Sequence, residues 1–325
     1  MAYCACTQIQ EMSVEKTISR YAKVKAASRL GRYADHKGLK WLLAGIYTQT
    51  AAHRLDFTYR CCRPALPAEL PSDAGFVVSL TSFPPRMGTL WMVVDLLMRQ
   101  TLRPAEIVLN LFEGDFPNGL ADIPESLRPY MDLGLRIHFV SENLRSHLKY
   151  HYTFIREAAG LRRPVITVDD DLFYPLDAFE RLMGLHGSNP GCICANTARR
   201  ITRLPSGAAR PYREWEDVLY AEPASDDKIA LGFGGVLYPA EFYCRAENIL
   251  LDRKTVVDLC LKADDLWLKA CEMRDGFKVV CGEYFPLPVD IPSSQQISLS
   301  RQNVGESAND RYWAVLESSI IPQED

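Results

Sequence analysis

The sequence predicts an α/β protein with a doubly wound, mostly parallel sheet. Three observations support this fold class. Apolar strand-like runs alternate with helix-like segments after residue 75, later segments interrupt the alternation, and the N-terminal region has a helical composition. We therefore expect a mixed C-terminal portion of the sheet and a helical N-terminal extension. A chain of 325 residues can form one large domain with an appendage, or two domains.

The predicted elements follow one another along the chain. Strands are expected in residues 75–83, 105–112, 135–140 and 164–171, with helices through residues 88–101 and 150–160 between them. Residues 192–215 have the pattern of a strand followed by an irregular excursion, and residues 228–243 that of a glycine-bent strand. In such sheets the ligand site lies beyond the carboxyl ends of the strands, where Thr81 and Ser82 fall.

A proline-rich stretch from Arg63 to Gly75 marks a linker. We divide the chain there into a basic helical N-terminal region, residues 1–73, and a main domain, residues 74–325. In the run from Lys16 to Lys40, eight basic residues stand against the single acid Asp35. One interpretation is a solvated helical face, and the other is contact with an anionic membrane or a lipid-linked substrate.

Charge and cysteine usage limit the functional classes. With 37 Lys and Arg against 41 Asp and Glu, the chain is unsuited to coating nucleic acid over its whole surface. The ten cysteines form no Cys-x-x-Cys pair, so we expect reduced thiols and a cytoplasmic location, peripheral at the inner face of the membrane if the basic run binds lipid. The start lacks a secretory pattern, and no apolar run reaches the ~20 residues of a membrane span.

Three consecutive carboxylates, Asp169 to Asp171, follow the expected strand at "VITV". Adjacent carboxylates repel one another unless a positive charge gathers them. Capping of the next helix does not require them, because Asp177 and Glu180 form a capping-box arrangement of their own. The triplet also lacks the alternating oxygens, central Gly and distant Glu of an EF-hand loop. Carboxylates at a strand end suit Mg²⁺ or Mn²⁺, which would neutralise the charge on a departing diphosphate.

This stretch resembles the Asp-x-Asp motif of GT-A-fold nucleotide-sugar glycosyltransferases. The wider pattern resembles the glycosyltransferase domain of the exostosin family and related bacterial transferases of surface polysaccharide synthesis. The shared landmarks, in the family's order, are "SLTSFPPR", "HLKYHYTF", "VITVDDDLFYP", "RPYREW", "GFGGVLYP" and "KADDLWLKA". The resemblance implies a GT-A-like fold and a Mn²⁺ or Mg²⁺ cofactor.

The resemblance also assigns residues to the donor. It implies that Asp169 lies near the ribose, that Asp171 is the metal ligand, and that the first strand end, at Thr81, holds the base. We include Asp169 as a second metal ligand and Asp170 in the donor site. Many GT-A enzymes supply a metal-binding His from the C-terminal part of the chain, but the last histidine here is His186. The diphosphate and water would therefore complete the metal's ligands.

Two basic side chains could bind the diphosphate of the donor. Arg86 follows a Pro-Pro turn at the first strand end, and Lys149 opens the helix before the Asp strand. Each could equally be solvated surface, which is common for Arg and Lys. The resemblance favours donor binding for both.

Aromatic and glycine residues are candidates for the acceptor side. Tyr212 and Trp215 could stack on a pyranose, although buried packing is the alternative for either ring. In "GFGGVLYP", Gly232, Gly234 and Gly235 indicate a bend, and a bare backbone there would also let a sugar ring approach. We assign Gly234 and Gly235, with the two aromatics, to the acceptor.

A second acidic pair, Asp264 and Asp265, begins a predicted helix. Acids favour helix N-termini, so capping is one interpretation. In GT-A enzymes an acid at this helix start faces the acceptor hydroxyl or the reacting sugar. We therefore expect a catalytic role for the pair, Asp265 above all, as a base in an inverting enzyme or a positioning group in a retaining one.

The predicted function is that of a metal-dependent glycosyltransferase acting on a nucleotide diphosphate-sugar and a glycan or lipid-linked acceptor, in bacterial surface polysaccharide synthesis. One alternative is a sugar nucleotidyltransferase, although "SLTSFPPRMG" lacks the Gly-rich loop of that class. The other is a non-catalytic carbohydrate-binding protein of the same fold. Two acidic clusters argue against the latter, because carboxylates gathered without a cation repel one another.

Overall fold

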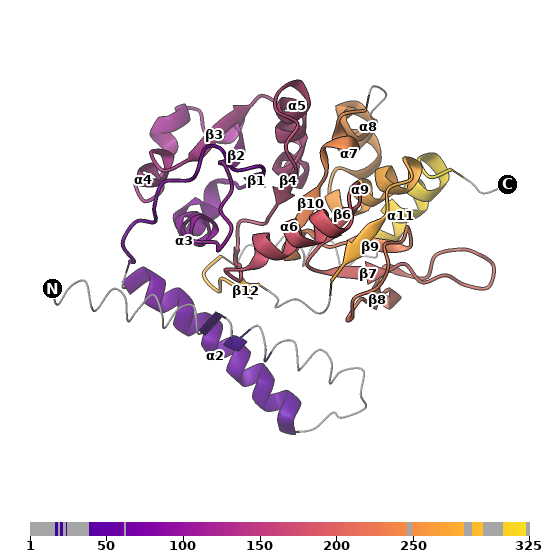
Figure 1. The fold of residues 1–325 in the computed structure, drawn as a ribbon, viewed down its shortest axis with the longest axis horizontal. Coiled ribbons are helices and arrows are strands. Elements are labelled where there is room, and N and C mark those ends of the chain that lie inside the picture. The colour runs from indigo at the N-terminus through magenta and orange to yellow at the C-terminus, as the bar shows by residue number, and fades with distance from the viewer. Residues whose placement is uncertain are drawn as a thin grey trace.

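A seven-stranded sheet forms the centre of the protein in a computed structural model, which describes residues 17, 18, 20, 21, 24, 39–61, 63–245, 249–282, 288–294 and 308–322. The strand order is β11-β6-β10-β4-β1-β2-β3. Strand β10 runs antiparallel to both β4 and β6, and the other neighbours are parallel. The predicted α/β class, with a mostly parallel sheet and a mixed C-terminal portion, is confirmed (Figure 1).

The strands are short and mostly buried. Their bounds are β1 (Val77–Thr81), β2 (Ile107–Phe112), β3 (Leu135–Val140), β4 (Val165–Thr167), β6 (Ile193–Ala195), β10 (Val236–Tyr238) and β11 (Val279–Cys281). Two small antiparallel sheets flank them, made of β5 (Leu172–Phe173) with β12 (Val289–Asp290), and of β7 (Ala198–Arg200) with β8 (Glu216–Asp217) and β9 (Lys228–Ala230).

Helices cover both faces of the sheet. Their bounds are α2 (Leu39–Cys61), α3 (Met87–Met98), α4 (Arg128–Met131), α5 (His151–Ala159), α6 (Ala178–Ser188), α7 (Ala240–Tyr243), α8 (Arg253–Cys260), α9 (Asp264–Arg274) and α11 (Ala308–Ser319). Short 3-10 helices are η1 (Pro84–Arg86), η2 (Glu113–Asp115), η3 (Gly119–Asp122), η4 (Arg145–Lys149), η5 (Tyr212–Glu214), η6 (Gly232–Gly234) and η7 (Ile249–Leu251).

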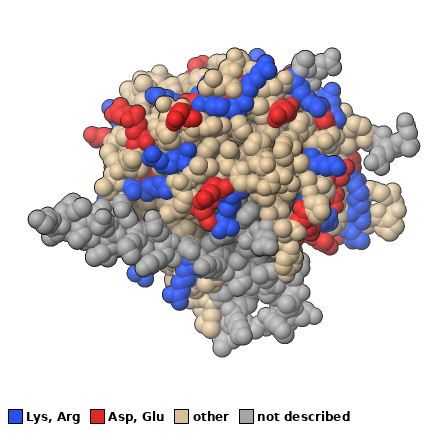
Figure 2. Space-filling model, in the orientation of Figure 1, with Lys and Arg blue, Asp and Glu red and all other residues tan. Residues whose placement is uncertain are grey.

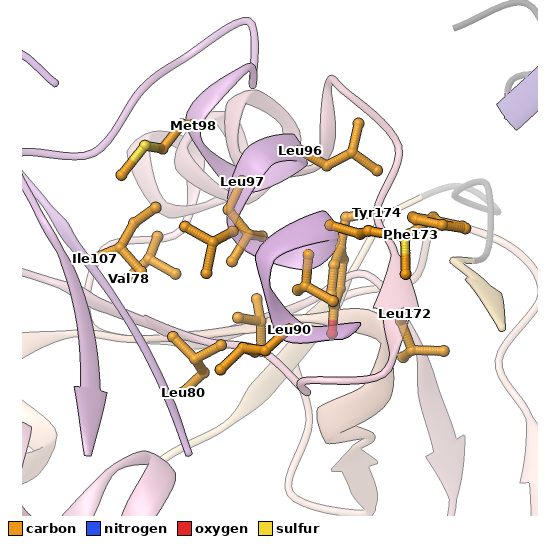
Figure 3. Packing of buried hydrophobic residues seen from close by; sticks show 14 of the residues in the cluster. Val78, Leu80, Leu90, Leu96, Leu97, Met98, Ile107, Leu172, Phe173 and Tyr174 are labelled. Carbon is orange, nitrogen blue, oxygen red and sulfur yellow. The ribbon is translucent and has the colours of Figure 1, made fainter. Parts of the chain in front are cut away.

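Alternation along the strands separates two hydrophobic cores. Successive side chains of a strand point to opposite faces. Val78 and Leu80 of β1 therefore join the core under α3 and α6, whereas Val77 joins the core under α5 and α9. Figure 3 shows Val78, Leu80 and Leu90 packed together in the first core. Both faces of the central strands are buried, which explains their nearly continuous apolar runs, whereas the edge strand β3 exposes Arg136 and His138.

Helix α2 attaches the N-terminal region to the main body. The hydroxyl of Tyr59 donates to Asp95 of α3 at 3.1 Å, and Ser293 donates its backbone N–H and hydroxyl to Asp56 at 3.2 and 3.0 Å. The division at residue 73 stays a prediction. Most of the basic run from Lys16 to Lys40 lies outside the described residues.

Surface and cysteine features agree with the composition. Acidic and basic side chains are interspersed over the face in Figure 2. The cysteines at 61, 192, 194, 244, 260, 271 and 281 are free thiols, as expected. In the described part of the chain, no helix combines the length and hydrophobicity that a membrane crossing requires.

Two local expectations were wrong. Asp177 is the N-cap of α6 but makes no capping bond with its side chain, because its carboxylate pairs with Arg181 instead. Glu180 accepts a hydrogen bond from Thr101 at 2.8 Å, so no capping box forms. The glycine-bent strand at residues 228–243 is two strands, β9 and β10, separated by the 3-10 helix η6.

Candidate active site

Strand register brings the Asp triplet beside the end of β1. Strands β1 and β4 are parallel, with Ser79 opposite Thr167. Three residues further along each chain, Ser82 meets Asp170, and its hydroxyl donates to the carboxylate at 2.6 Å. The carboxyl ends of neighbouring parallel strands thus form one edge, which is the usual place for a ligand in this architecture.

Arg86 provides the counter-charge that the Asp triplet requires. The 3-10 helix η1, with two prolines at its start, aims the guanidinium back at the triplet. Nη1 lies 2.5 Å from Asp170 Oδ1, and Nη2 lies 3.0 Å from Asp171 Oδ2. Burial alone would lower the pKa of Arg86, but the two carboxylates raise it. Burial raises the pKa of Asp170 despite Arg86 and Ser82.

Lys149 joins the two acidic clusters that the sequence places about 95 positions apart. It ends η4, and its Nζ lies 2.6 Å from Asp264, 3.2 Å from Asp169 and 3.9 Å from Asp265. Burial would lower the pKa of Lys149, yet the three carboxylates raise it well above its usual value, so the ammonium stays charged. We call the five carboxylates of Asp169, Asp170, Asp171, Asp264 and Asp265, together with Arg86 and Lys149, the carboxylate cluster.

Asp264 and Asp265 have different protonation behaviour although they are adjacent. Neither caps α9, whose N-cap is Ala263 and has no side-chain bond. Burial would raise the pKa of Asp264, but Lys149 lowers it to about 2. Burial and the charge of Asp264 together raise the pKa of Asp265 to about 7. Such a split leaves one carboxylate ionised and the other able to exchange a proton near neutral pH.

Glycines at the start of β10 make room for the cluster. Because β10 is antiparallel to β4, its first residues lie at the edge where β4 ends. The backbone N–H of Gly232 donates to both oxygens of Asp265 at 3.2 Å. A Cβ at Gly232 would lie 2.6 Å from Lys149 Nζ, and one at Gly234 would lie 2.5 Å from Thr197 Oγ1. Gly235 has a φ of 85°, which favours glycine.

The two candidate aromatics have different surroundings. Trp215 is buried, with its ring edge on to Trp313 and its Nε1–H donating to the Arg210 carbonyl at 2.9 Å. Tyr212 is half-buried, and the Arg199 guanidinium lies 5.5 Å from its ring centroid. Burial and then the charge of Asp265 raise the pKa of Tyr212 to about 12. Of the pair, Tyr212 is therefore the one whose hydroxyl feels the charge of the carboxylate cluster.

Thr81 lies at the same edge but donates its hydroxyl hydrogen to the Asn110 carbonyl of β2 at 2.8 Å. Two supporting residues were not among the predicted site residues. Tyr174 accepts the backbone N–H of Asp169 at 2.8 Å, and His147 bonds Tyr150 and the Cys260 carbonyl at 2.8 and 2.9 Å. The sequence pointed to these residues only through their location, because they lie in the short segments that contain predicted site residues.

The predicted metal ligands supply part of a coordination shell. Asp169 and Asp171 lie on either side of buried Asp170, with side chains 31% and 13% exposed. Among the described residues, no three side chains of His, Cys, Asp or Glu gather as a metal-binding group. Two hard carboxylate oxygens fit Mg²⁺ or Mn²⁺ when phosphate oxygens of a substrate supply the other ligands.

Comparison with known proteins gives structural neighbours only. No family model matches the chain, and no curated protein matches its sequence. The fold is similar to the mannosyltransferase PcManGT from Pyrobaculum calidifontis in complex with GDP-Man and Mn²⁺, at 13% identity and a TM-score of 0.41, over 73% of this chain and 65% of that one. This chain thus spans just under two thirds of that protein.

Two further solved structures are similar at comparably low identity and TM-score. S. aureus TarS 1-349 has 10% identity and a TM-score of 0.42, over 75% of this chain and 73% of that one. The 4-diphosphocytidyl-2C-methyl-D-erythritol synthase has 15% identity and a TM-score of 0.41, over 70% and 99%. Identities and TM-scores this low show resemblance in fold and leave the function to the residues of the site.

Proposed function

We propose that this protein is a nucleotide-sugar glycosyltransferase whose active site is the carboxylate cluster. One observation carries the proposal. Lys149 draws Asp169, Asp264 and Asp265 together at the carboxyl edge of the sheet, and Asp265 has a pKa of about 7. Residues with strongly shifted pKa values often mark catalytic sites, and a base works best with a pKa near the working pH.

The donor half of the site comprises Arg86, Asp169, Asp170 and Asp171. Arg86 keeps Asp170 and Asp171 in place through two ion pairs, and Ser82 fixes the second oxygen of Asp170. Asp169 and Asp171 would hold Mg²⁺ or Mn²⁺, which when bound neutralises charge on the departing diphosphate. Thr81, at the end of β1, would face the base. Lys149 adds a fixed positive charge beside Asp169.

Asp265 acts on the acceptor in this proposal. Its carboxylate, 31% exposed, is oriented by the Gly232 N–H and lies near Lys149, while Asp264 remains the ionised partner of that lysine. Deprotonated Asp265 would remove the proton from an acceptor hydroxyl as it attacks the anomeric carbon. A carboxylate base of this kind implies inversion at that carbon. Tyr212, Gly234 and Gly235 complete the acceptor half, and buried Trp215, which packs against the Tyr212 ring, supports it from the core instead of contacting the acceptor.

The acceptor is proposed to be a glycan or a lipid-linked sugar, in the setting of bacterial surface polysaccharide synthesis that the sequence resemblance implies. The basic run from Lys16 to Lys40 supports a lipid-linked acceptor, because polybasic segments are attracted to anionic membrane surfaces. A protein that meets such acceptors in the cytoplasm would bind the inner face of the membrane peripherally.

A panel of nucleotide sugars tests the proposal. The full chain is incubated with each sugar and Mn²⁺, and release of nucleoside diphosphate by slow transfer to water is measured. One donor should be hydrolysed, and the Asp265→Asn variant should be much slower with the same donor. Pyrophosphate made from a nucleoside triphosphate and a sugar phosphate would instead identify a nucleotidyltransferase. Binding of a sugar without any turnover would indicate a carbohydrate-binding protein.

The product then tests the role of Asp265. Nuclear magnetic resonance of a product formed with a methyl glycoside acceptor reports its anomeric configuration. An anomer opposite to that of the donor is expected for a carboxylate base. A retained anomer would assign Asp265 to positioning the sugar or acceptor.

A further inference from the structure

The C-terminal helix α11 holds the turn that carries Tyr212. The backbone N–H of Tyr212 donates to Asp310 Oδ1 at 2.6 Å. The rings of Trp215 and Trp313 meet edge to face, with centroids 5.2 Å apart and planes at 85°. Arg203 donates to Glu317 at 2.6 Å. The three α11 residues are spaced three and four apart, so they lie on one face of the helix.

Bonds inside the segment fix its shape, and β8, which follows the Tyr212 turn, pairs with β7. Arg203 and Ala209 form an isolated antiparallel bridge, and Glu214 donates its N–H to the Pro211 carbonyl. These bonds join residues of the same excursion. Trp313 and Leu316, in contrast, belong to the core that also contains Trp267 of α9. Helix α11 therefore connects the Tyr212 turn to the helix that begins with Asp264 and Asp265.

Tyr212 lies where this connection meets the carboxylate cluster. Its ring centroid is 4.9 Å from that of Trp215, and the Arg199 guanidinium lies over it. The charge of Asp265 acts on its hydroxyl, which stays protonated at neutral pH because its pKa is about 12. A protonated hydroxyl beside the base can donate to a sugar oxygen and orient the attacking hydroxyl.

We propose that Asp310 and Trp313 are positioning residues for the acceptor half of the site, and that α11 keeps the Tyr212 turn in place there. The inference rests on the proposed function for its consequence in catalysis. The donor half is built around the ion pairs of Arg86 with Asp170 and Asp171, whereas the α11 contacts go to the turn that carries Tyr212. Loss of the α11 contacts should therefore impair the acceptor and spare the donor.

The experiment uses three variants of the full chain. Asp310→Ala removes the acceptor of the Tyr212 N–H, whereas Asp310→Asn retains an oxygen that can accept it. Arg311→Ala, at an exposed neighbour on the same helix, is the matched control. Hydrogen–deuterium exchange followed by mass spectrometry reports protection of residues 211–215. Exchange there should rise in Asp310→Ala by about tenfold or more, as expected for a lost charge-assisted hydrogen bond.

Kinetics provide the second readout, with p-nitrophenyl glycosides as acceptor probes and the donor identified by the nucleotide-sugar panel. Asp310→Ala should raise KM for the glycoside about tenfold or more and leave KM for the donor within about twofold. Asp310→Asn should restore both readouts to near the wild-type values.

Two results would overturn the inference: unchanged exchange at residues 211–215 in Asp310→Ala, or an equal change in the KM values for donor and glycoside. Failure of the proposed function is a separate outcome, since then the wild-type chain releases no nucleoside diphosphate from any donor. In that case the exchange comparison alone decides whether α11 positions Tyr212.

Discussion

Asp170 and Asp171 are adjacent, but they differ in burial and in the number of hydrogen bonds that they accept. Asp170 is buried and receives hydrogen bonds from both Arg86 and Ser82, so it helps to hold η1 against the end of β4. Asp171 shares the same guanidinium but is more exposed. The proposed function thus assigns a structural role to Asp170 and the metal-binding role to Asp171.

Substitution of each residue by alanine should separate these roles. Asp170→Ala breaks a buried ion pair and should lower the free energy of unfolding by about 3 kcal/mol. Asp171→Ala leaves Arg86 paired with Asp170, so no buried charge is left unpaired and the loss of stability should be smaller than in Asp170→Ala. It should nevertheless abolish metal-dependent donor turnover. Urea denaturation and donor hydrolysis measure the two effects, and full turnover by Asp171→Ala in a chelator would exclude a metal role for this residue.

Asp265 should control the pH dependence of the reaction. With a pKa of about 7 it is mostly protonated below that pH, so kcat/KM should rise with pH up to about 7 and then level off. Asp265→Asn should remove this limb and reduce turnover by ~100-fold or more. Asp264→Asn removes a neighbouring negative charge, so it should move the limb to lower pH. A profile unchanged in Asp265→Asn would assign the titration to another group.

The same shift has a consequence for stability. The pKa of Asp265 rises from 3.8 to about 7 on folding, so the folded protein binds more protons than the unfolded chain between these values. Stability contributed by this group therefore falls as the pH increases from about 4 to 7. Asp264 behaves in the opposite way, because its pKa of about 2 lies below 3.8 and its contribution is lost on acidification.

At the scale of elements, η6 matters because it carries Gly232 past two charged side chains. A methyl group at Gly232 would lie 2.6 Å from Lys149 Nζ and 2.8 Å from Asp265 Oδ1. Both are ends of side chains that can move aside, so the backbone need not shift. The geometry of the carboxylate cluster would change more than the stability of the fold.

Gly232→Ala should therefore reduce turnover by about tenfold or more while lowering stability by about 1 kcal/mol at most. Gly184→Ala is the control, since Gly184 is exposed on α6 and an added Cβ would have no neighbour within 4 Å. That variant should gain up to about 1 kcal/mol of stability and keep full turnover. Thermal unfolding and donor hydrolysis measure both. A fully active Gly232→Ala variant would show that a bare backbone is unnecessary there.

Elements with a strong local pattern could be predicted from the sequence. The runs that became β1 and β4 and the helix α5 lie within their predicted ranges, and α3 begins one residue before its predicted start at Gly88. The capping box was wrong because Asp177 has a competing partner, Arg181, four residues later. The antiparallel course of β10 could not be deduced, since strand direction depends on partners distant in sequence. Its glycines predicted a bend, and the structure has a 3-10 turn there.

Individual site residues could be predicted from the sequence, but their spatial arrangement could not. A positive charge near the Asp triplet followed from electrostatics, and Arg86 and Lys149 were candidates for it. That Lys149 contacts Asp264 depends on packing between η4 and α9, 115 positions apart in sequence. Neither periodicity nor spacing contains that information. The split pKa values of Asp264 and Asp265 follow from the same packing and were equally invisible.

At the scale of the whole molecule, the proposed membrane contact should depend on salt. The full chain should float with liposomes that contain anionic lipid at low ionic strength and be released at high salt, since each basic residue near the surface contributes ~1 kcal/mol. Replacing Lys16, Lys23, Lys25 and Arg29 with Gln should weaken flotation. Neutral phosphatidylcholine liposomes are the control. Equal flotation of both proteins would show that the basic run makes no contact with lipid.

The position of β10 between β4 and β6 has a consequence for how the chain is made on the ribosome. Strands β1 to β4 emerge first, and β4 then has an open edge until residues 236–238 are synthesised. Val165 and Ile166 on that edge are completely buried in the finished protein. An open apolar edge can pair with another chain. We therefore expect nascent chains that end between residues 168 and 235 to aggregate unless a chaperone covers this edge.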